Sequence, residues 1–291
     1  MTAPFLKWVG GKRALLDQFE YLFPSAAMLV DRHYVEPFIG GGAVFFKLAD
    51  RIGQTVNGDV RRYAFLNDSN RDLMLCYMDV RDSVQTVIDN LAQLEVLFEE
   101  DPENTYYNVR ESFNLGGIGI GDCAGSSRSA ALIFLNKTCF NGIWRVNKTG
   151  GFNVPMGRFK TPPVICDRER LLAASMALVN THANICAQDF REFWCGFEQR
   201  RVFMYLDPPY DGTFDSYTKD GFDEQDQRDL AQKCRELDGA GGLFMASNAD
   251  TPLIRKLYEG FDIKIVTQQV SVNSDSTGRG KIGDLVIRNY K

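Results

Sequence analysis

The tetrapeptide Asp-Pro-Pro-Tyr at residues 207–210 is the most chemically specific feature of the sequence. Pro208 and Pro209 have fixed φ angles and no N–H donors, so the carbonyl of Pro208 can act as an acceptor beside the carboxylate of Asp207. Two adjacent acceptors suit one exocyclic amino group, because hydrogen bonding to both of its N–H groups exposes the nitrogen lone pair. Tyr210 adds an aromatic face on which an extruded base can stack. The alternative is a strand-terminating turn with a packing tyrosine.

Glycines follow an expected strand in the segment Glu-Pro-Phe-Ile-Gly-Gly-Gly at residues 36–42. An apolar run over 28–35 predicts a buried strand and residues 44–48 predict a helix, so the glycines form the turn between them. Such a turn lets the backbone approach a ligand closely, and Asp68 lies where a carboxylate can accept hydrogen bonds from a ribose diol. This strand, turn and helix indicate a nucleoside-containing cofactor. The turn lacks the third glycine of the dinucleotide-binding fingerprint. A plain turn, with Asp68 as the N-cap of the next helix, is the alternative.

Helices and short buried strands alternate along much of the chain, which predicts an α/β sheet with helices on both faces. Strands are expected over 28–35, 64–66, 184–187, 201–206, 242–246, 261–267 and 284–290, and helices over 71–100, 168–179 and 225–237. Ligands of open α/β sheets bind beyond the carboxyl ends of the strands. The glycine turn, Asn67-Asp68, Asp189-Phe190 and the tetrapeptide all follow expected strands, so we expect them to converge on one site.

Residues 110–163 break this alternation, because they are rich in Gly, Asn and Lys and have weak periodicity. We expect loops, short helices and a hairpin there rather than strands of the sheet. The sequence thus predicts a catalytic domain of residues 1–70 plus 166–291 and an inserted domain of residues 71–165.

The composition is that of a globular protein, with 44% hydrophobic and 24% charged residues. No apolar stretch is long enough for a membrane span and no signal-peptide core is found, so we expect a soluble cytoplasmic protein. Seven Cys without a CxxC pair and only two His argue against a disulfide framework and against a metal site.

The net charge of -5 hides a segregation of charge along the chain. The segment 123–166 has six basic residues and no Asp or Glu, and basic residues also predominate in the first and last thirteen residues. Basic patches suit a phosphate backbone, because lysine and arginine displace its counterions. The alternative is that these are solvated faces without a partner.

These motifs and their order resemble the Dam-type DNA adenine-N6 methyltransferases, the α group or D12 class of amino methyltransferases. The resemblance runs along nearly the whole chain, with a cofactor motif first, a recognition block second and the Asp-Pro-Pro-Tyr motif third. The matching segments are Phe5–Lys12, Val35–Phe46, Leu66–Asn70, Phe134–Asn147, Gly151–Phe159, Asp207–Tyr210 and Ser247-Asn248.

The resemblance implies a Rossmann-like S-adenosylmethionine-dependent methyltransferase sheet, mostly parallel with the last strand antiparallel, and an inserted, mainly helical target-recognition domain. It implies methyl transfer from S-adenosyl-L-methionine to N6 of adenine in double-stranded DNA, within GATC or a related short site, by base flipping and a direct in-line step. The implied catalytic residues are Asp207, Pro208, Pro209 and Tyr210. The implied cofactor residues are Trp8, Lys12, Phe38, Gly40, Gly42, Asp68, Asp189, Phe190 and Asp207, with Asp68 on the ribose and Asp189 with Phe190 on the adenine.

The same resemblance implies a set of DNA contacts. Arg145 lies where the family has a base-reading arginine, Phe140 matches its intercalating aromatic residue, and Lys7 would touch the first base pair. The implied DNA-binding residues are Lys7, Lys137, Phe140, Asn141, Ile143, Arg145 and Arg158, with Lys148 and Lys160 as further phosphate contacts. For each basic residue other than Arg145, a phosphate contact or solvent exposure is favoured over base reading.

Two further features bear on DNA recognition. A loop at 271–283 resembles a basic hairpin that follows the DNA backbone. The family often has Tyr where this sequence has Phe159, and the missing hydroxyl removes one hydrogen bond to a base or phosphate, which leaves the recognition sequence open.

Three other functions remain open. A nicotinamide-dependent oxidoreductase would account for the glycine turn and Asp68 but not for the tetrapeptide. A relative that methylates an amino group of RNA or of a protein glutamine would keep the chemistry, but Asp207 and the basic block favour adenine in duplex DNA. A DNA-binding regulator without turnover is disfavoured by the intact tetrapeptide. We expect a monomer that binds double-stranded DNA and uses neither a membrane nor a metal.

Overall fold

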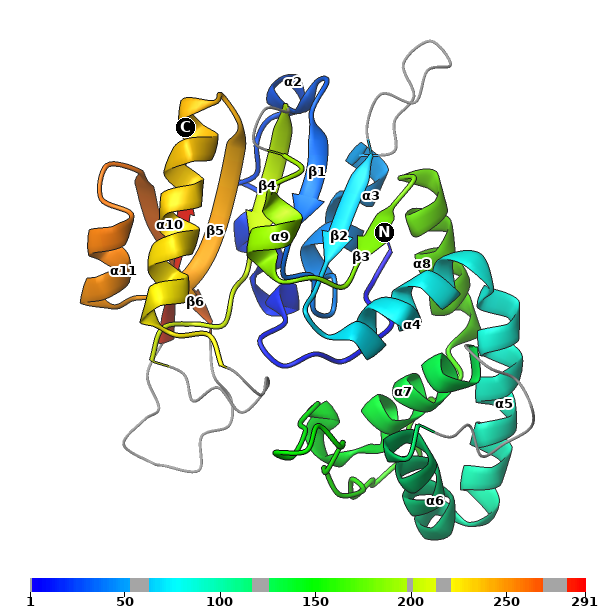
Figure 1. The fold of residues 1–291 in the computed structure, drawn as a ribbon. Helices are drawn as coiled ribbons and strands as arrows, with labels where there is room; N and C mark the ends of the chain where they lie inside the picture. Colours follow the sequence, from blue (N-terminus) through cyan, green and yellow to red (C-terminus); the bar gives the residue numbers. More distant parts are fainter. Residues whose placement is uncertain (1, 53–62, 117–125, 198–200, 213–220, 269–281) are drawn as a thin grey trace.

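A computed structural model describes residues 2–52, 63–116, 126–197, 201–212, 221–268 and 282–291. In these residues seven strands form one sheet in the order β3-β2-β1-β4-β5-β7-β6 (Figure 1). Strands β1 to β5 pair in parallel, and β7 runs antiparallel to both β5 and β6. This confirms the predicted mostly parallel sheet with the last strand antiparallel. The strands are β1 (His33–Glu36), β2 (Ala64–Asn67), β3 (Asn184–Cys186), β4 (Val202–Leu206), β5 (Leu243–Ala249), β6 (Asp262–Gln268) and β7 (Ile282–Arg288).

Strand β1 lies where the order of strands reverses. Its Tyr34 pairs with Ala64 of β2 on one side and with Phe203 of β4 on the other. In open α/β sheets, ligands bind outside the carboxyl ends of the strands at such a switch point. The glycine turn follows β1 and the Asp-Pro-Pro-Tyr segment follows β4, so both candidate segments leave the sheet at this point.

Two apolar cores cover the two faces of the sheet. Alternate residues of a strand enter different cores, Tyr34 and Phe203 one of them and Val35 the other. Because the central strands are buried on both faces, they appear in the sequence as continuous apolar runs. The first core includes residues of η1 (Lys12–Leu15), α1 (Leu16–Phe19) and α3 (Ala43–Ile52), and the second includes residues of α9 (Phe190–Trp194), α10 (Glu224–Gly239) and α11 (Pro252–Leu257).

Between β2 and β3 the chain folds mainly into helices, which extend away from the sheet in Figure 1. Helix α7 packs against the three helices before it, and Arg128 at its start forms two hydrogen bonds with the carboxylate of Asp72 on α4. Helix α8 contacts α3 as well as α4 and α5, so it connects this group to the sheet. The predicted domain bounds stay a prediction. The helices are α4 (Arg71–Asp82), α5 (Val84–Glu100), α6 (Pro102–Asn114), α7 (Ser126–Thr138) and α8 (Arg168–Asn180).

Several stretches differ from the sequence-based expectation, among them residues 102–114, which form α6 where the pattern predicts no helix. Residues 26–29 form the helix α2 (Ala26–Leu29), because the Ser25 side chain accepts a hydrogen bond from the Met28 N–H and caps it, and the strand begins only at His33. Residues 126–138 form one helix where the pattern predicts loops and short helices. From Ser129 onward nearly every residue of α7 is buried, so no amphipathic period marks it.

After α7 the chain forms the hairpin that the sequence predicts. A short 3-10 helix, η2 (Phe140–Gly142), lies between two antiparallel bridges, which pair Cys139 with Met156 and Val146 with Phe152. The Asn147 side-chain oxygen accepts the backbone N–H groups of Thr149 and Gly151, at 3.0 and 2.9 Å, and so closes the tip. None of the described helices is both long and apolar enough to cross a bilayer.

Candidate active site

Asp207 is the first residue beyond the fully buried strand β4, and it meets Lys12 from the N-terminal segment. The Lys12 ammonium lies 2.7 Å from Oδ1 of Asp207, and the two side chains are only 6% and 19% exposed. The same ammonium donates to the carbonyl of Gly10, at 2.7 Å. Burial raises the pKa of Asp207, and the positive charge of Lys12 opposes that rise. The pair therefore keeps a carboxylate acceptor in a largely dry place.

Tyr210 is held at both ends of its side chain. Its hydroxyl donates to Asp284 of β7 at 2.9 Å, and the Lys12 ammonium lies 4.7 Å from the centre of its ring. Burial, followed by the nearby charges of Asp207 and Asp284, raises the pKa of Tyr210 well above its usual range. The phenol thus stays neutral, and its ring is fixed beside the carboxylate of Asp207.

The glycine turn is held by side chains from β2 and α4. Gly40 donates its N–H to Asp68 at 3.0 Å and accepts from the Tyr77 hydroxyl at 3.0 Å. Gly40 and Gly42 have φ angles of +47° and +70°, and residues with a Cβ rarely adopt this backbone conformation. A Cβ on Gly42 would lie 2.7 Å from the Tyr77 hydroxyl, so glycine is required there for conformation and for space.

Asp68 lies at this turn and does not cap the following helix. Its carboxylate accepts the N–H groups of Gly40 and Asn70, while Asn70 is the N-cap of α4 and accepts from the Leu73 N–H at 3.1 Å. The alternative interpretation of Asp68 as the helix cap is therefore wrong. Burial raises the pKa of Asp68, and its two backbone hydrogen bonds oppose the rise.

Trp8 packs directly on the glycine turn. A Cβ on Gly40 or on Gly41 would come within 2.9 Å of the Trp8 side chain, so the indole uses the space that the missing side chains leave. The other neighbour of Trp8 is Trp144 from the hairpin region, stacked at 6.1 Å between ring centres with 19° between the planes. One indole thus connects the predicted cofactor turn with the predicted recognition region.

The remaining predicted cofactor residues are in two environments. Phe38 and Phe190 pack against each other and against Phe222, with 5.4 Å between the Phe38 and Phe190 ring centres. Asp189 is more exposed and caps α9 by accepting the N–H of Arg191. Between the two loops, the buried Asn67 side chain donates to the carbonyls of residues 37 and 188 and accepts the N–H of residue 188. The structure thus brings the segments after β1, β2 and β3 together.

The N-terminal segment is fixed to α7 by Asn136. This buried side chain accepts the Lys7 N–H at 2.9 Å and donates to the Lys7 carbonyl at 2.6 Å, while the Lys7 side chain is exposed. Phe140 is 48% exposed at the turn that follows α7, and Asn141 beside it is exposed with a φ of +56°. Ile143 is partly buried.

The predicted basic contacts differ in exposure. Arg145, Lys148, Arg158 and Lys160 are exposed, and the Arg145 Nε donates to the Asn153 side chain at 2.8 Å. Lys137 is only 8% exposed, and burial lowers its pKa. Its burial leaves little of Lys137 for a phosphate, which speaks against the expected contact. Residues 271–281 of the expected basic hairpin lie outside the described residues.

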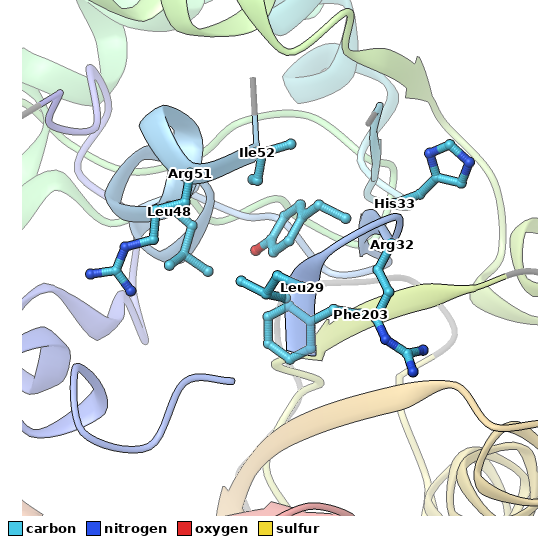
Figure 2. A pocket seen from close by; sticks show the side chains of 8 residues that line it. Leu29, Arg32, His33, Leu48, Arg51, Ile52 and Phe203 are labelled. Atoms are coloured by element: carbon cyan, nitrogen blue, oxygen red, sulfur yellow. The ribbon is translucent and has the colours of Figure 1, made fainter. Parts of the chain in front are cut away.

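Figure 2 shows a pocket at the opposite end of the sheet. It is lined by residues at the amino ends of β1 and β4 and by the end of α3, namely Leu29, Arg32, His33, Tyr34, Leu48, Arg51, Ile52 and Phe203. Asp207 and the glycine turn lie beyond the carboxyl ends of these strands, so this pocket is not part of the candidate site. Within the described ranges, no group of three or more His, Cys, Asp or Glu residues is placed to hold a metal ion.

Sequence reasoning missed the residues that hold the site in place. Tyr77, Asn136, Gln227 and Asp284 each hydrogen bond a predicted site residue, either at its backbone or at its side chain. Gln227 could have been recognised from the sequence, because it is a polar residue at a core-facing position of an amphipathic helix. It lies three residues before the buried Leu230 and seven before the buried Cys234.

Comparison with known proteins agrees with this geometry. Residues 8–272 match the family model described as D12 class N6 adenine-specific DNA methyltransferase. The chain is 40% identical to the type II methyltransferase M.MjaIII of Methanocaldococcus jannaschii, over 99% of each chain. It is 35% identical to the type II methyltransferase M1.LlaDCHI of Lactococcus lactis, over 99% of this chain and 95% of the relative. It is 33% identical to a DNA adenine methylase of Vibrio cholerae, over 97% of this chain and 94% of the relative. The chain therefore belongs to the D12 class of N6 adenine-specific DNA methyltransferases.

Proposed function

We propose that this enzyme transfers a methyl group from S-adenosylmethionine to N6 of an adenine turned out of duplex DNA, within GATC or a related short site. The observation that carries the proposal is the position of Asp207, which is held against Lys12 and Tyr210 beside the glycine turn at the switch point of the sheet. Such an enzyme would act on DNA in the cytoplasm.

The residues around the turn fit a nucleoside cofactor. Gly40 and Gly42 keep the turn free of side chains, and Asp68 offers a partly buried carboxylate next to it whose remaining lone pairs can accept from a ribose diol. Partly exposed Phe38 supplies aromatic surface within the glycine segment, and it packs against Phe190, which is 4% exposed at the start of α9. We propose that these residues, with Trp8, Lys12 and Asp189, bind S-adenosylmethionine, which when bound supplies an electrophilic methyl group.

The chain's own contribution to the step is binding and orientation. The Asp207 carboxylate and the Pro208 carbonyl would accept the two N–H groups of the target amine, and Tyr210 would stack on the adenine. Lys12 favours the ionised form of Asp207, which is the form that accepts. No covalent enzyme intermediate is needed, so catalysis rests on positioning and on the exclusion of water.

We further propose that the turn after α7 and the hairpin bind DNA. Exposed Phe140 would enter the base stack, and exposed Arg145 would read a base edge, its guanidinium already oriented by Asn153. Lys7, Asn141 and Ile143 would lie close to the same base pairs, and Arg158 would contact a phosphate. A substrate in RNA or in a protein is less well supported, since the named relatives in Vibrio cholerae and elsewhere are DNA adenine methylases.

The direct test uses labelled S-adenosylmethionine, unmethylated genomic DNA and sequencing of the modified bases. The expected product is N6-methyladenine in one short context. Asp207→Ala should lower the methylation rate by about 100-fold or more while DNA affinity stays near that of the wild type. The matched control is Asp250→Ala, which removes an exposed carboxylate paired with Arg255. Equal activity in Asp207→Ala would exclude the proposed acceptor pair.

The recognition proposal is tested by Arg145→Ala with Lys148→Ala as its control. Arg145→Ala should relax sequence preference, at a cost of about 1 to 3 kcal/mol in discrimination at one base pair. Lys148→Ala at the hairpin tip should weaken binding to all DNA sequences equally. It should also reduce the slope of the logarithm of the binding constant against the logarithm of the salt concentration by about one. An unchanged preference in Arg145→Ala would place that residue among the phosphate contacts.

A further inference from the structure

Two buried amides form a chain of hydrogen bonds behind the Asp-Pro-Pro-Tyr segment. Gln227 of α10 donates from Nε2 to the carbonyl of Pro209 at 2.9 Å, and Asn248 of β5 donates from Nδ2 to Oε1 of Gln227 at 2.9 Å. Asn248 in turn accepts the N–H of Asp211 at 3.1 Å. Gln227 and Asn248 are each 1% exposed, so neither amide exchanges these partners for water.

The direction of this chain is fixed by its two ends. The Asp211 N–H can only donate and the Pro209 carbonyl can only accept, so each amide between them has one orientation that satisfies both neighbours. The ends lie on either side of Tyr210, which is therefore held by its backbone neighbours as well as by Asp284 at its hydroxyl. The Thr251 hydroxyl also donates to Asp211 at 2.6 Å and extends the support to α11.

A double-proline turn needs support of this kind. Neither proline has an N–H, so the backbone can be held there only through carbonyl oxygens. The Pro209 carbonyl is bound by Gln227, whereas no hydrogen bond to the neighbouring Pro208 carbonyl is found among the described residues. A buried glutamine on a core-facing helix position carries a desolvation cost unless its amide is paired, and here its oxygen and its nitrogen both have partners.

We propose that Gln227 and Asn248 are positioning residues for methyl transfer, which hold the Pro209 carbonyl and thereby aim the Pro208 carbonyl and the Asp207 carboxylate at the target amine. The inference rests on the proposed function of Asp207 and Pro208 as the acceptor pair. Neither residue touches cofactor or base in this role. Removing either amide should therefore affect the transfer step and leave binding of both ligands unchanged.

The test compares Gln227→Leu and Gln227→Glu in single-turnover methylation of a duplex that the wild type modifies. Both variants should lose about 10- to 100-fold in rate, because a displacement of about 1 Å at reacting groups costs that much. The dissociation constants for duplex DNA and for S-adenosylhomocysteine should stay within about two-fold of wild type. A glutamate can donate only when protonated, so the rate of Gln227→Glu relative to wild type should recover toward acidic pH, whereas that of Gln227→Leu should not.

Asn248→Asp and a surface variant complete the design. Asn248→Asp keeps the acceptor for Asp211 but loses the donor to Gln227, so it should show the same kind of loss, and the double variant with Gln227→Leu should be no slower than the slower single variant. Gln232→Glu on the exposed face of α10 controls for added charge. Folded variants with wild-type single-turnover rates, or equal losses in rate and in binding, would overturn the inference. Absence of adenine methylation by the wild type would instead overturn the proposed function.

Discussion

The ammonium of Lys12 lies 2.7 Å from a carboxylate oxygen of Asp207, although the two residues are far apart in the sequence. Burial alone would favour the protonated acid at position 207, and a protonated acid offers fewer acceptor sites to an amine. The positive charge of Lys12 opposes that effect. The N-terminal segment is therefore expected to set the pH range in which the candidate acceptor works.

Lys12→Met should move the acidic limb of the pH–rate profile to higher pH. The pKa of Asp207 is already raised by burial and would rise further without the ammonium, so the ionised form would be lost earlier as pH falls. We expect a clear loss in kcat/KM at pH 6 and a smaller loss at pH 8, because the ionised fraction of Asp207 falls as the pH falls. Arg13→Met removes an exposed cation from the same short helix as a control. If the acidic limb of the pH–rate profile stays in place and cofactor binding weakens, Lys12 serves only to bind the cofactor.

Gly42→Ala should destabilise the fold through both strain and a clash. Gly42 has a φ of +70°, and an added Cβ would lie 2.7 Å from the Tyr77 hydroxyl and 3.1 Å from Phe46. We expect a loss of about 2 to 4 kcal/mol in the free energy of unfolding, measured in urea. Gly116→Ala is a matched control, since its φ is +69° and an added Cβ meets no atom of the described residues within 4 Å, so it should cost only about 1 kcal/mol.

Tyr77→Phe separates the clash from the strain. Alone it removes the hydrogen bond to Gly40 and should cost about 1 kcal/mol. Combined with Gly42→Ala it also removes the atom that the new methyl group meets, so the double variant should be less destabilised than the two single losses together. Strictly additive losses would show that the methyl group is accommodated without contact with Tyr77.

Much of this arrangement can be predicted from sequence, because the site residues follow strands. Buried strands leave continuous apolar runs, and the polar residues directly after them, such as Asp68 and Asp207, must meet at one edge of a parallel sheet. The pairing of Lys12 with Asp207 leaves no such pattern, since it depends on how a short N-terminal helix packs. Helix α7 is hidden for the opposite reason, because a helix buried on nearly every side has no polar face.

The support of the site is less visible in sequence than the site itself. Asn67, Asn136 and Gln227 are buried polar residues that hydrogen bond backbone groups at positions 37, 7 and 209, and Gln227 also accepts from the Asn248 side chain. A backbone partner leaves no signature in the residue type at its position. The sequence shows only that a polar residue occupies a core position. Such a residue requires a hydrogen-bond partner, but its type does not indicate which group that partner is.

Glu36→Gln should flatten the pH dependence of stability. Glu36 is 2% exposed and accepts from the Tyr34 hydroxyl at 2.7 Å, and burial raises its pKa well above the usual range. For an acid whose folded pKa is raised, the stabilising contribution is complete below the unfolded pKa and is lost as pH rises toward the folded value. The wild type should therefore lose up to about 1.4 kcal/mol per pH unit more than the variant above about pH 4.5. Parallel stability curves from urea unfolding at pH 4 to 8 would contradict this assignment.

Trp144→Phe should uncouple cofactor binding from DNA binding. Trp8 packs on Gly40 and Gly41 and stacks on Trp144, so a ligand that fixes the glycine turn also fixes the base of the hairpin. We expect S-adenosylhomocysteine to raise the affinity of the wild type for duplex DNA. The ratio of the affinities with and without S-adenosylhomocysteine should be at least three-fold smaller in the variant. Fluorescence anisotropy of labelled duplex, with and without S-adenosylhomocysteine, measures both factors.

The control for this coupling is Phe140→Ala, which changes an exposed aromatic residue of the same region and leaves the indole stack intact. It should weaken DNA binding in both the presence and the absence of S-adenosylhomocysteine by the same factor, since a lost contact with DNA does not depend on the glycine turn. Because coupling is reciprocal, DNA should also tighten S-adenosylhomocysteine binding less in Trp144→Phe than in Phe140→Ala. A coupling factor in Trp144→Phe equal to that of the wild type would mean that the indole stack transmits nothing between the two sites.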